Sequence, residues 1–167
     1  MRARLALLGL TVAAPLAFAS PAASEKPLKF PLPAGPVDLP AAICGFVVHE
    51  EILTNNASGK IFTNGTFALS GTFKVRLTNV DEPTNTLDVN ISGPGAFIPN
   101  PDGTTSLRAE GRSLFFFLPG ELSAGSPGAL ILTTGLVTEL FDATFNVVPG
   151  SFSHPRGTET DVCAALA

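Results

Sequence analysis

The two histidines of this chain are the side chains best suited to acid–base chemistry. His49 stands in His49-Glu50-Glu51 and lacks the second histidine, four residues on, that a zinc-protease helix requires. Its surroundings alternate like a strand, so we expect a surface or half-buried strand residue, with a ligand-binding or catalytic-base role as the alternative. His154 lies in a segment predicted to be a loop, whose hydroxyls and guanidinium suit a site but are equally ordinary loop chemistry.

Other catalytic patterns are absent from the sequence. It has no Gly-x-Ser-x-Gly motif for a serine nucleophile, and its adjacent carboxylates, Glu50-Glu51 and Asp81-Glu82, would point to opposite faces of a strand or sit in a turn. The chain has no Trp and no Tyr, the residues that usually stack on sugar rings. We therefore favour a non-enzyme without metal or cofactor, and a carbohydrate-binding module is disfavoured.

The first 19 residues predict a secretory signal peptide. Arg2 and Arg4 give a positive start, residues 5–16 are largely apolar, and Ala17-Phe18-Ala19 supplies small residues at the cleavage spacing. A membrane anchor is the alternative, but the apolar run is shorter than the ~20 residues that span a bilayer. We expect a secreted protein with no integral membrane segment in the mature chain.

Cys44 and Cys163 are the only cysteines, and they lie near the two ends of the predicted folded region. In an exported protein an even number of cysteines predicts a disulfide, here one Cys44–Cys163 bridge. Two free buried thiols or half of a metal site are the alternatives, and the lack of a CxxC spacing argues against the metal. Closing so long a loop stabilises a domain by about 4 to 5 kcal/mol in the chain-entropy model.

Composition describes an acidic, sparsely charged, β-rich domain. The 167 residues are 45% hydrophobic and 14% charged, with a net charge of −4 that becomes −6 when Arg2 and Arg4 leave with the signal peptide. Nucleic acids and anionic membranes require clustered Lys or Arg, and the sequence has no such cluster. We therefore expect no nucleic-acid partner, and a domain large enough to bury a core of its own.

Residues 20–41 predict a Pro-rich extended leader, and residues 42–167 predict a single β domain. The leader carries six prolines, each without an N–H donor, which argues against a strand or helix there. Beyond it, short apolar runs separated by turn residues predict eight to ten strands. Only Asp161–Leu166 is predicted to form a single helical turn.

The clearest predicted strand covers residues 66–78, where apolar and polar residues alternate over a dozen positions. Asn64-Gly65 before it predicts a type I′ hairpin turn, because both residues accept positive φ. Ala96–Ile98 is predicted to be an edge strand or a loop anchor. Gly111 predicts a bulge inside one long bent strand, and Leu114–Leu118 is apolar throughout, so both of its faces must be covered.

Short strands with hairpin-length connections predict an all-β antiparallel meander, closed into a barrel or folded as a β-sandwich. We favour the barrel, because a bridge from the first strand to the C-terminal tail brings the chain ends together, as pairing of the first and last strands would. Sandwiches with a core disulfide usually pack a Trp against it, and this chain has none.

Four short features carry a resemblance to one group of proteins: the Ala-rich signal peptide, Ile43-Cys44-Gly45-Phe46, residues 73–79 (FKVRLTN) and residues 161–166 (DVCAAL). Together they are similar to small exported proteins of actinobacteria. The resemblance implies export and pairing of the two cysteines. It implies no activity and carries over no catalytic residue, and a likeness of fold would not by itself fix a function.

Our first functional hypothesis is a secreted, non-catalytic β-barrel domain that binds a small apolar ligand. Its expected lining is Phe67, Phe73, Phe115 and Phe117, with His49 as a polar candidate. The alternative for these phenylalanines is that they only fill the core.

Two further hypotheses stay open. One is an extracellular structural or protein-interaction module, and the other is a cyclase- or isomerase-like barrel enzyme with His49 or Glu51 as base. The volume of the interior separates them: a cavity of roughly a few hundred Å³ with one or two polar groups would favour ligand binding, and a solid core would favour interaction.

Overall fold

The computed structural model describes residues 26–167 and shows an all-β protein. The predicted signal peptide, residues 1–19, and residues 20–25 of the predicted leader lie outside the described residues. The described chain forms eleven strands and two short helices, in the order β1 (Leu28–Pro31), β2 (Val37–Leu39), α1 (Ala41–Cys44), β3 (Val48–Asn55), β4 (Ser58–Ile61), β5 (Phe67–Ser70), β6 (Phe73–Asn79), β7 (Thr86–Asn90), β8 (Gly95–Pro99), β9 (Thr105–Phe117), β10 (Ala129–Phe141), β11 (Ser153–Asp161) and α2 (Val162–Leu166).

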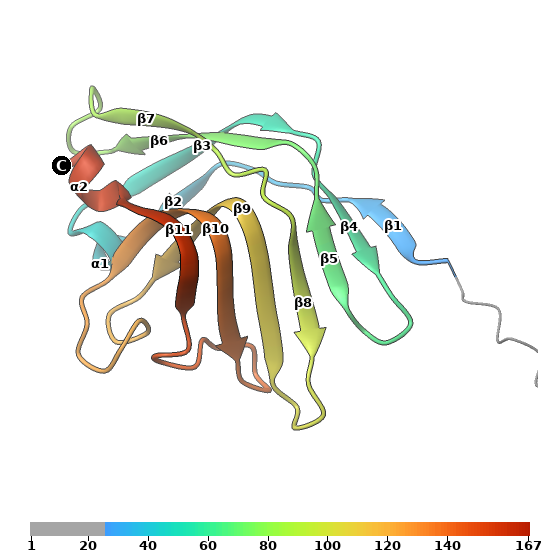
Figure 1. Ribbon diagram of the computed structural model, residues 1–167. Coiled ribbons are helices and arrows are strands. Elements are labelled where there is room, and N and C mark those ends of the chain that lie inside the picture. The colour runs from blue at the N-terminus through green and yellow to red at the C-terminus, as the bar shows by residue number, and fades with distance from the viewer. Residues whose placement is uncertain (1–25) are drawn as a thin grey trace, which may run out of the picture.

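The strands belong to two antiparallel sheets (Figure 1). The seven-stranded sheet has the order β1-β4-β5-β8-β9-β10-β11, and the four-stranded sheet has the order β2-β3-β6-β7. Within residues 26–167 neither sheet closes, because β1 and β11 end the larger sheet at opposite edges. The all-β antiparallel prediction is confirmed, the barrel is wrong, and the sandwich alternative fits the two sheets.

The predicted disulfide is confirmed: Cys44 and Cys163 are bonded, with Cα atoms 5.1 Å apart. The bridge joins α1 to α2, so it brings the chain ends together without any pairing of first and last strands. That is why the argument for barrel closure failed. The predicted helical turn is also confirmed, since the Asp161 carboxylate caps α2 by accepting from the Ala164 N–H at 3.0 Å.

A bent hairpin connects the two sheets. β3 pairs with β6 in the four-stranded sheet, and their continuations β4 and β5 pair in the seven-stranded sheet. Gly71 lies at the bend with φ 130°, and a Cβ there would come within 2.3 Å of the Asn56 carbonyl oxygen. Only glycine fits this approach, so the single strand predicted over 66–78 is divided into two.

Two local predictions about this region need correction. The hairpin turn lies where predicted, with Gly65 at φ 82°, but its loop spans residues 62–66 rather than two residues, so it is not a two-residue type I′ turn. The Ala96–Ile98 segment lies within β8, which pairs with both β5 and β9. It is therefore an interior strand and not an edge, because strands pair with it on both sides.

Three glycines lie side by side across β9, β10 and β11. Gly135 pairs with Gly111 on one side and Gly157 on the other, and all three have positive φ. The buried hydrophobic residues of β10 are Leu130 and Leu132 before Gly135 and Val137 after it. Burial therefore moves from even-numbered to odd-numbered positions at the glycine row. The chain arches here (Figure 1), and β9 and β10 each contribute to two separate hydrophobic clusters.

Gly111 thus lies within one long strand as predicted, but the predicted bulge is wrong, because the β9–β10 register does not shift there. Close backbone approach explains two glycines of the row: a Cβ on Gly135 would come within 2.1 Å of the Arg156 carbonyl oxygen, and one on Gly157 within 1.5 Å of the Thr134 oxygen.

The predicted leader is part of the sheets. Its extended segments β1 and β2 pair with β4 and β3, and each is an edge strand of its sheet. Prolines are tolerated at such positions because an edge strand needs N–H donors on one side only. The leader is extended as expected, but the argument that its prolines exclude a strand was wrong for these residues.

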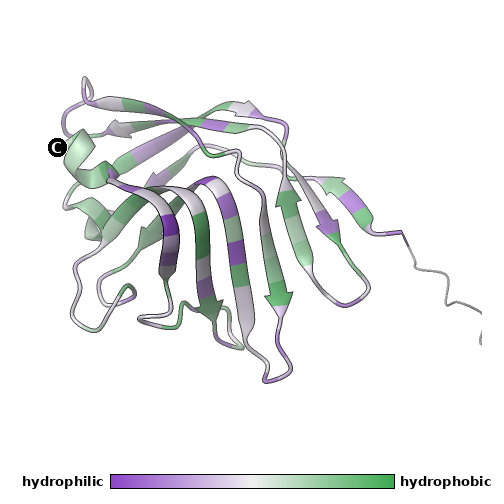
Figure 2. Cartoon of the chain, viewed as in Figure 1, coloured by the Kyte–Doolittle hydropathy of each residue, from purple (hydrophilic) through white to green (hydrophobic). Residues whose placement is uncertain are grey.

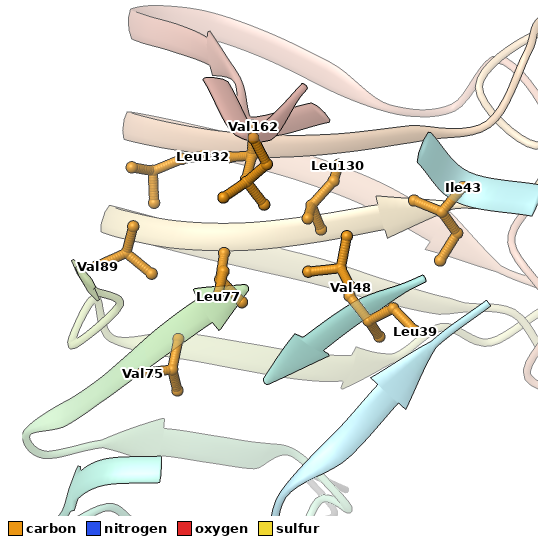
Figure 3. Packing of buried hydrophobic residues seen from close by; sticks show 10 residues of the cluster. Leu39, Ile43, Val48, Val75, Leu77, Val89, Leu130, Leu132 and Val162 are labelled. Carbon is orange, nitrogen blue, oxygen red and sulfur yellow. The ribbon is translucent and has the colours of Figure 1, made fainter. Parts of the chain in front are cut away.

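The larger cluster, here called the aliphatic core, lies between the four-stranded sheet, β10 and α2 (Figure 3). Its buried members are Leu39, Ile43, Val48, Val75, Leu77, Val89, Leu130, Leu132, Val162 and Leu166. Figure 3 shows Leu130, Leu132 and Val162 facing Val48 and Leu77 across the interface. At the edge of this core, Asn79 Nδ2 donates to the Leu166 carbonyl oxygen at 3.0 Å and fastens α2 to β6.

Among residues 26–167, neither helix is long and apolar enough to cross a membrane.

Candidate functional site

A cavity of about 480 Å³ lies against the arched part of the seven-stranded sheet. Its apolar walls come from β8, β9, β10 and the turn after β10, and include Phe97, Leu107, Phe115, Phe141 and Phe145. Figure 2 shows that β8 is largely hydrophobic, whereas β9 alternates between hydrophobic and hydrophilic residues. We call this cavity the aromatic pocket; its volume is in the range that small-molecule sites occupy.

Two carboxylates, Glu121 and Glu139, line the same pocket. Glu139 is only 4% exposed, and its Oε1 has no hydrogen-bond partner. Burial, followed by the negative charge of Glu121, raises the pKa of Glu139 to about 7. An unpaired buried carboxyl is costly to fold, so a protein that keeps one in an apolar cavity has a reason outside packing.

The strand register explains how Glu139 comes to face the pocket. Val137, Glu139 and Phe141 alternate with more exposed residues in β10, and Glu139 lies opposite Leu107 of β9. The sequence carried this signal, since an acidic residue occupies an inward position of an alternating strand. Glu139 was not predicted as a site residue, because it has no acidic neighbour in the sequence and so forms no adjacent carboxylate pair.

Two phenylalanines of the pocket are also exposed to solvent. Phe116 and Phe145 are 56% and 59% exposed, although both are large apolar side chains. The prediction that both faces of Leu114–Leu118 are covered was therefore wrong for Phe116. The pocket therefore reaches the surface, and its mouth is apolar.

The turn that carries Phe145 is held by one side chain. Asp142 Oδ1 accepts from the Thr144 N–H at 2.8 Å, the Thr144 hydroxyl at 2.8 Å and the Asn146 N–H at 2.9 Å. The hydrogen bond from the Asn146 backbone contributes most to lowering the pKa of Asp142 to about 2. Phe145 has φ 67°, a region that bulky residues avoid, and its ring stacks on Phe141 at 4.8 Å between centroids. The turn thus orders Phe145 at the mouth.

A row of aromatic rings runs from the pocket across the sheet. Phe141 and Phe145 contact Phe97 at centroid distances of 5.8 and 5.6 Å, and Phe97 stacks on Phe67 at 6.2 Å. Phe67 stacks in turn on Phe30 of β1 at 5.9 Å. These contacts place the predicted residue Phe67 one ring away from the pocket rather than in its wall.

The other predicted phenylalanines have different surroundings. Phe115 lines the pocket as expected. Phe117 is 1% exposed and packs edge-on against Phe152, so it fills the interior. Phe73 borders a separate cavity of about 200 Å³ beside Leu69. The structure therefore brings only one of the four predicted phenylalanines into the pocket wall.

His49 and Glu51 lie in β3, and neither is among the residues lining the aromatic pocket. His49 Nδ1 is 2.6 Å from Asp38 Oδ1, and its partner belongs to the neighbouring edge strand β2. Glu51 is exposed, and Glu50 between them is half-buried, with its pKa raised by burial. None of these three residues lines the aromatic pocket.

His154 lies in β11 and not in a loop, so that prediction was wrong, and its side chain connects β11 to β10. Its Nε2 is 2.9 Å from the Thr134 carbonyl oxygen of β10, and its Nδ1 is 3.0 Å from Glu159 Oε1 of β11. Both ring nitrogens are occupied, which fits a structural histidine better than a base.

A second cavity and the possible metal ligands of the described chain were also compared with the aromatic pocket. A cavity of about 660 Å³ lies beside the disulfide and is lined mostly by small residues such as Ala42 and Gly128, so it offers few side chains for recognition. In residues 26–167, no three His, Cys, Asp or Glu side chains are grouped so as to hold a metal ion.

Comparisons with known proteins add no assignment. No family model, no curated protein and no solved structure matches the chain, so its function must be argued from the pocket.

Proposed function

We propose that this protein is an exported, non-catalytic binding protein that holds a small apolar ligand in the aromatic pocket. The observation that carries the proposal is the cavity itself, about 480 Å³, with aromatic walls and a buried carboxyl. Such a combination of apolar lining and very few polar groups is typical of small-molecule sites. The disulfide is consistent with an oxidising environment outside the cell.

Two features of the pocket mouth support the proposal that its phenylalanines bind a ligand rather than only fill the core. Phe116 and Phe145 stay exposed where burial would stabilise the fold, and Phe145 does so in a strained conformation. Strain of this kind is usually kept where a side chain has a role besides packing. A bound apolar ligand would remove both rings from water.

The proposal is tested with a naphthalene probe, whose fluorescence can be followed easily because the protein has no Trp or Tyr. We expect saturable binding of naphthylmethanol to the purified protein. Phe145→Ser should weaken binding roughly tenfold, since one aromatic contact contributes up to about 1.5 kcal/mol.

The matched control is Phe62→Ser, which removes another exposed phenylalanine that does not line the pocket. It should leave the affinity unchanged. If a panel of apolar probes fails to saturate the folded protein, or if both variants weaken binding equally, the aromatic pocket is not a ligand site.

A further inference from the structure

The charge on the ligand can be inferred from the side chains around Glu139. Glu121 and Glu139 are the only charged side chains among the pocket-lining residues of the described chain. The one other polar side chain, Asn146, donates to Thr144 Oγ1 at 2.6 Å and to Asp142 Oδ2 at 3.4 Å, so it is committed to its own turn. The polar side chains that remain to contact a ligand are therefore the two acidic ones, Glu121 and Glu139.

The elements packed around Glu139 supply no compensating cation. β8 has no charged residue, and Asp142 in the following turn is held by its own backbone. Arg108 of β9 is exposed and lies on the opposite face of the strand from the buried Leu107 and Ala109. On that exposed face it donates to Glu110 Oε1 at 2.6 Å. Glu121, on the loop after β9, adds a second negative charge and is itself fixed by accepting from the Leu118 N–H at 2.6 Å.

We propose that the ligand of the aromatic pocket is a hydrophobic amine, whose ammonium group binds Glu139 and Glu121 while its apolar body lies among the phenylalanines. This inference rests on the proposed function and specifies its ligand class. The ammonium donates the hydrogen bonds that Glu139 Oε1 lacks. The phenylalanine rings add to the attraction, because their negative faces attract a cation.

Neutral and anionic ligands fit these observations less well. An anion would meet two carboxylates and no cation in the pocket, which costs free energy at every pH where either is ionised. A neutral acceptor would satisfy a protonated Glu139 but would leave the charge of Glu121 unpaired. Only a cation is attracted by both.

Binding of an ammonium ion also has a consequence for protons. Because the carboxyl of Glu139 is largely protonated below pH 7 in the empty pocket, a cation that pairs with it displaces its proton. The proton leaves to buffer, so binding should release it, and a neutral ligand should not.

Three isosteric probes test the inference: naphthylmethylammonium, naphthylmethanol and naphthoate. We expect the ammonium to bind roughly ten- to hundredfold more tightly than the alcohol, which corresponds to about 1.4 to 2.8 kcal/mol, and naphthoate to bind most weakly. Glu139→Gln should lower the ammonium-to-alcohol ratio most, while Glu121 and the aromatic rings still attract the ammonium. Glu121→Gln should lower the ratio partly. Glu51→Gln, an exposed carboxylate of β3, should keep it.

Calorimetry at pH 6 in two buffers of different ionisation enthalpy gives the second measurement. The wild-type protein should release about one proton per ammonium bound, and Glu139→Gln should release none.

The outcomes separate the two proposals. Equal affinity of the wild-type protein for ammonium and alcohol, or an ammonium-to-alcohol ratio that Glu139→Gln leaves unchanged, overturns the amine inference and leaves apolar binding intact. Failure of all three probes to bind the folded protein overturns both.

Discussion

The aliphatic core and the aromatic pocket are built on two halves of the same strands, β9 and β10, yet only the first is filled. The core consists of interlocking Leu, Val and Ile side chains from both sheets and α2, with the disulfide at its edge. The pocket has flat aromatic rings, an unpaired carboxyl and a cavity. Branched aliphatic side chains can fill a space completely, whereas flat rings held apart by a turn can leave a cavity. The same two strands thus carry a filled core at one end and, at the other, the cavity to which we assign ligand binding in the proposed function.

Removing the disulfide should have the largest effect on stability and little effect on the pocket. Replacing Cys44 and Cys163 together by Ser frees a loop of 119 residues, and the chain-entropy model gives a loss of about 4 to 5 kcal/mol in the free energy of unfolding. Guanidinium denaturation measures the loss, and naphthylmethanol binding below the transition should persist. A loss under about 1 kcal/mol would show that the core does not depend on the bridge.

Truncation in the aliphatic core should give the next largest effect. Leu77 is fully buried there, so Leu77→Ala should lower the free energy of unfolding by about 2 to 5 kcal/mol through lost burial and a new cavity. Probe affinity of the folded variant should match wild type. If Leu77→Ala weakens probe binding as strongly as Phe145→Ser does, the aliphatic core and the aromatic pocket are coupled and are not independent regions.

Neutralising Glu139 should give a smaller, pH-dependent effect. Its pKa is raised from about 4.5 to about 7 on folding, so its contribution to stability is complete below pH 4.5 and is lost as the pH rises through 7. Glu139→Gln does not titrate, and should therefore gain about 3 kcal/mol relative to wild type between pH 4.5 and pH 8. Urea denaturation at both pH values measures this gain.

Glu51→Gln serves as the control and should show no comparable dependence on pH. A stability difference between Glu139→Gln and wild type that stays constant from pH 4.5 to pH 8 would mean that Glu139 is ionised throughout.

Local patterns in the sequence predicted much of the fold. The alternating strands and the helical turn at Asp161 could be predicted, because they depend on residues close together in the sequence. The pairing of Cys44 with Cys163 could be predicted because these are the only two cysteines. The bend at Gly71 and the arch at Gly135 were not, because each depends on backbone approach between strands distant in sequence.

The site was harder to predict than the fold for the same reason. Phe115 was found as one member of an apolar run, but Phe97, Phe145 and Glu139 come together only through the register of β8, β9 and β10. The position of Glu139 in an alternating strand was visible, whereas the absence of any partner for its carboxyl is a property of three dimensions.

The prolines of β1 and β2 bear on how molecules of this protein behave next to one another. The segment from residue 28 to residue 39 forms one edge of each sheet, the place where a second copy could add a strand. Pro31 ends β1, and Pro36 and Pro40 flank β2, so neither edge presents an uninterrupted series of N–H groups. At these two edges the prolines therefore hinder a second copy of the chain from adding a strand to either sheet.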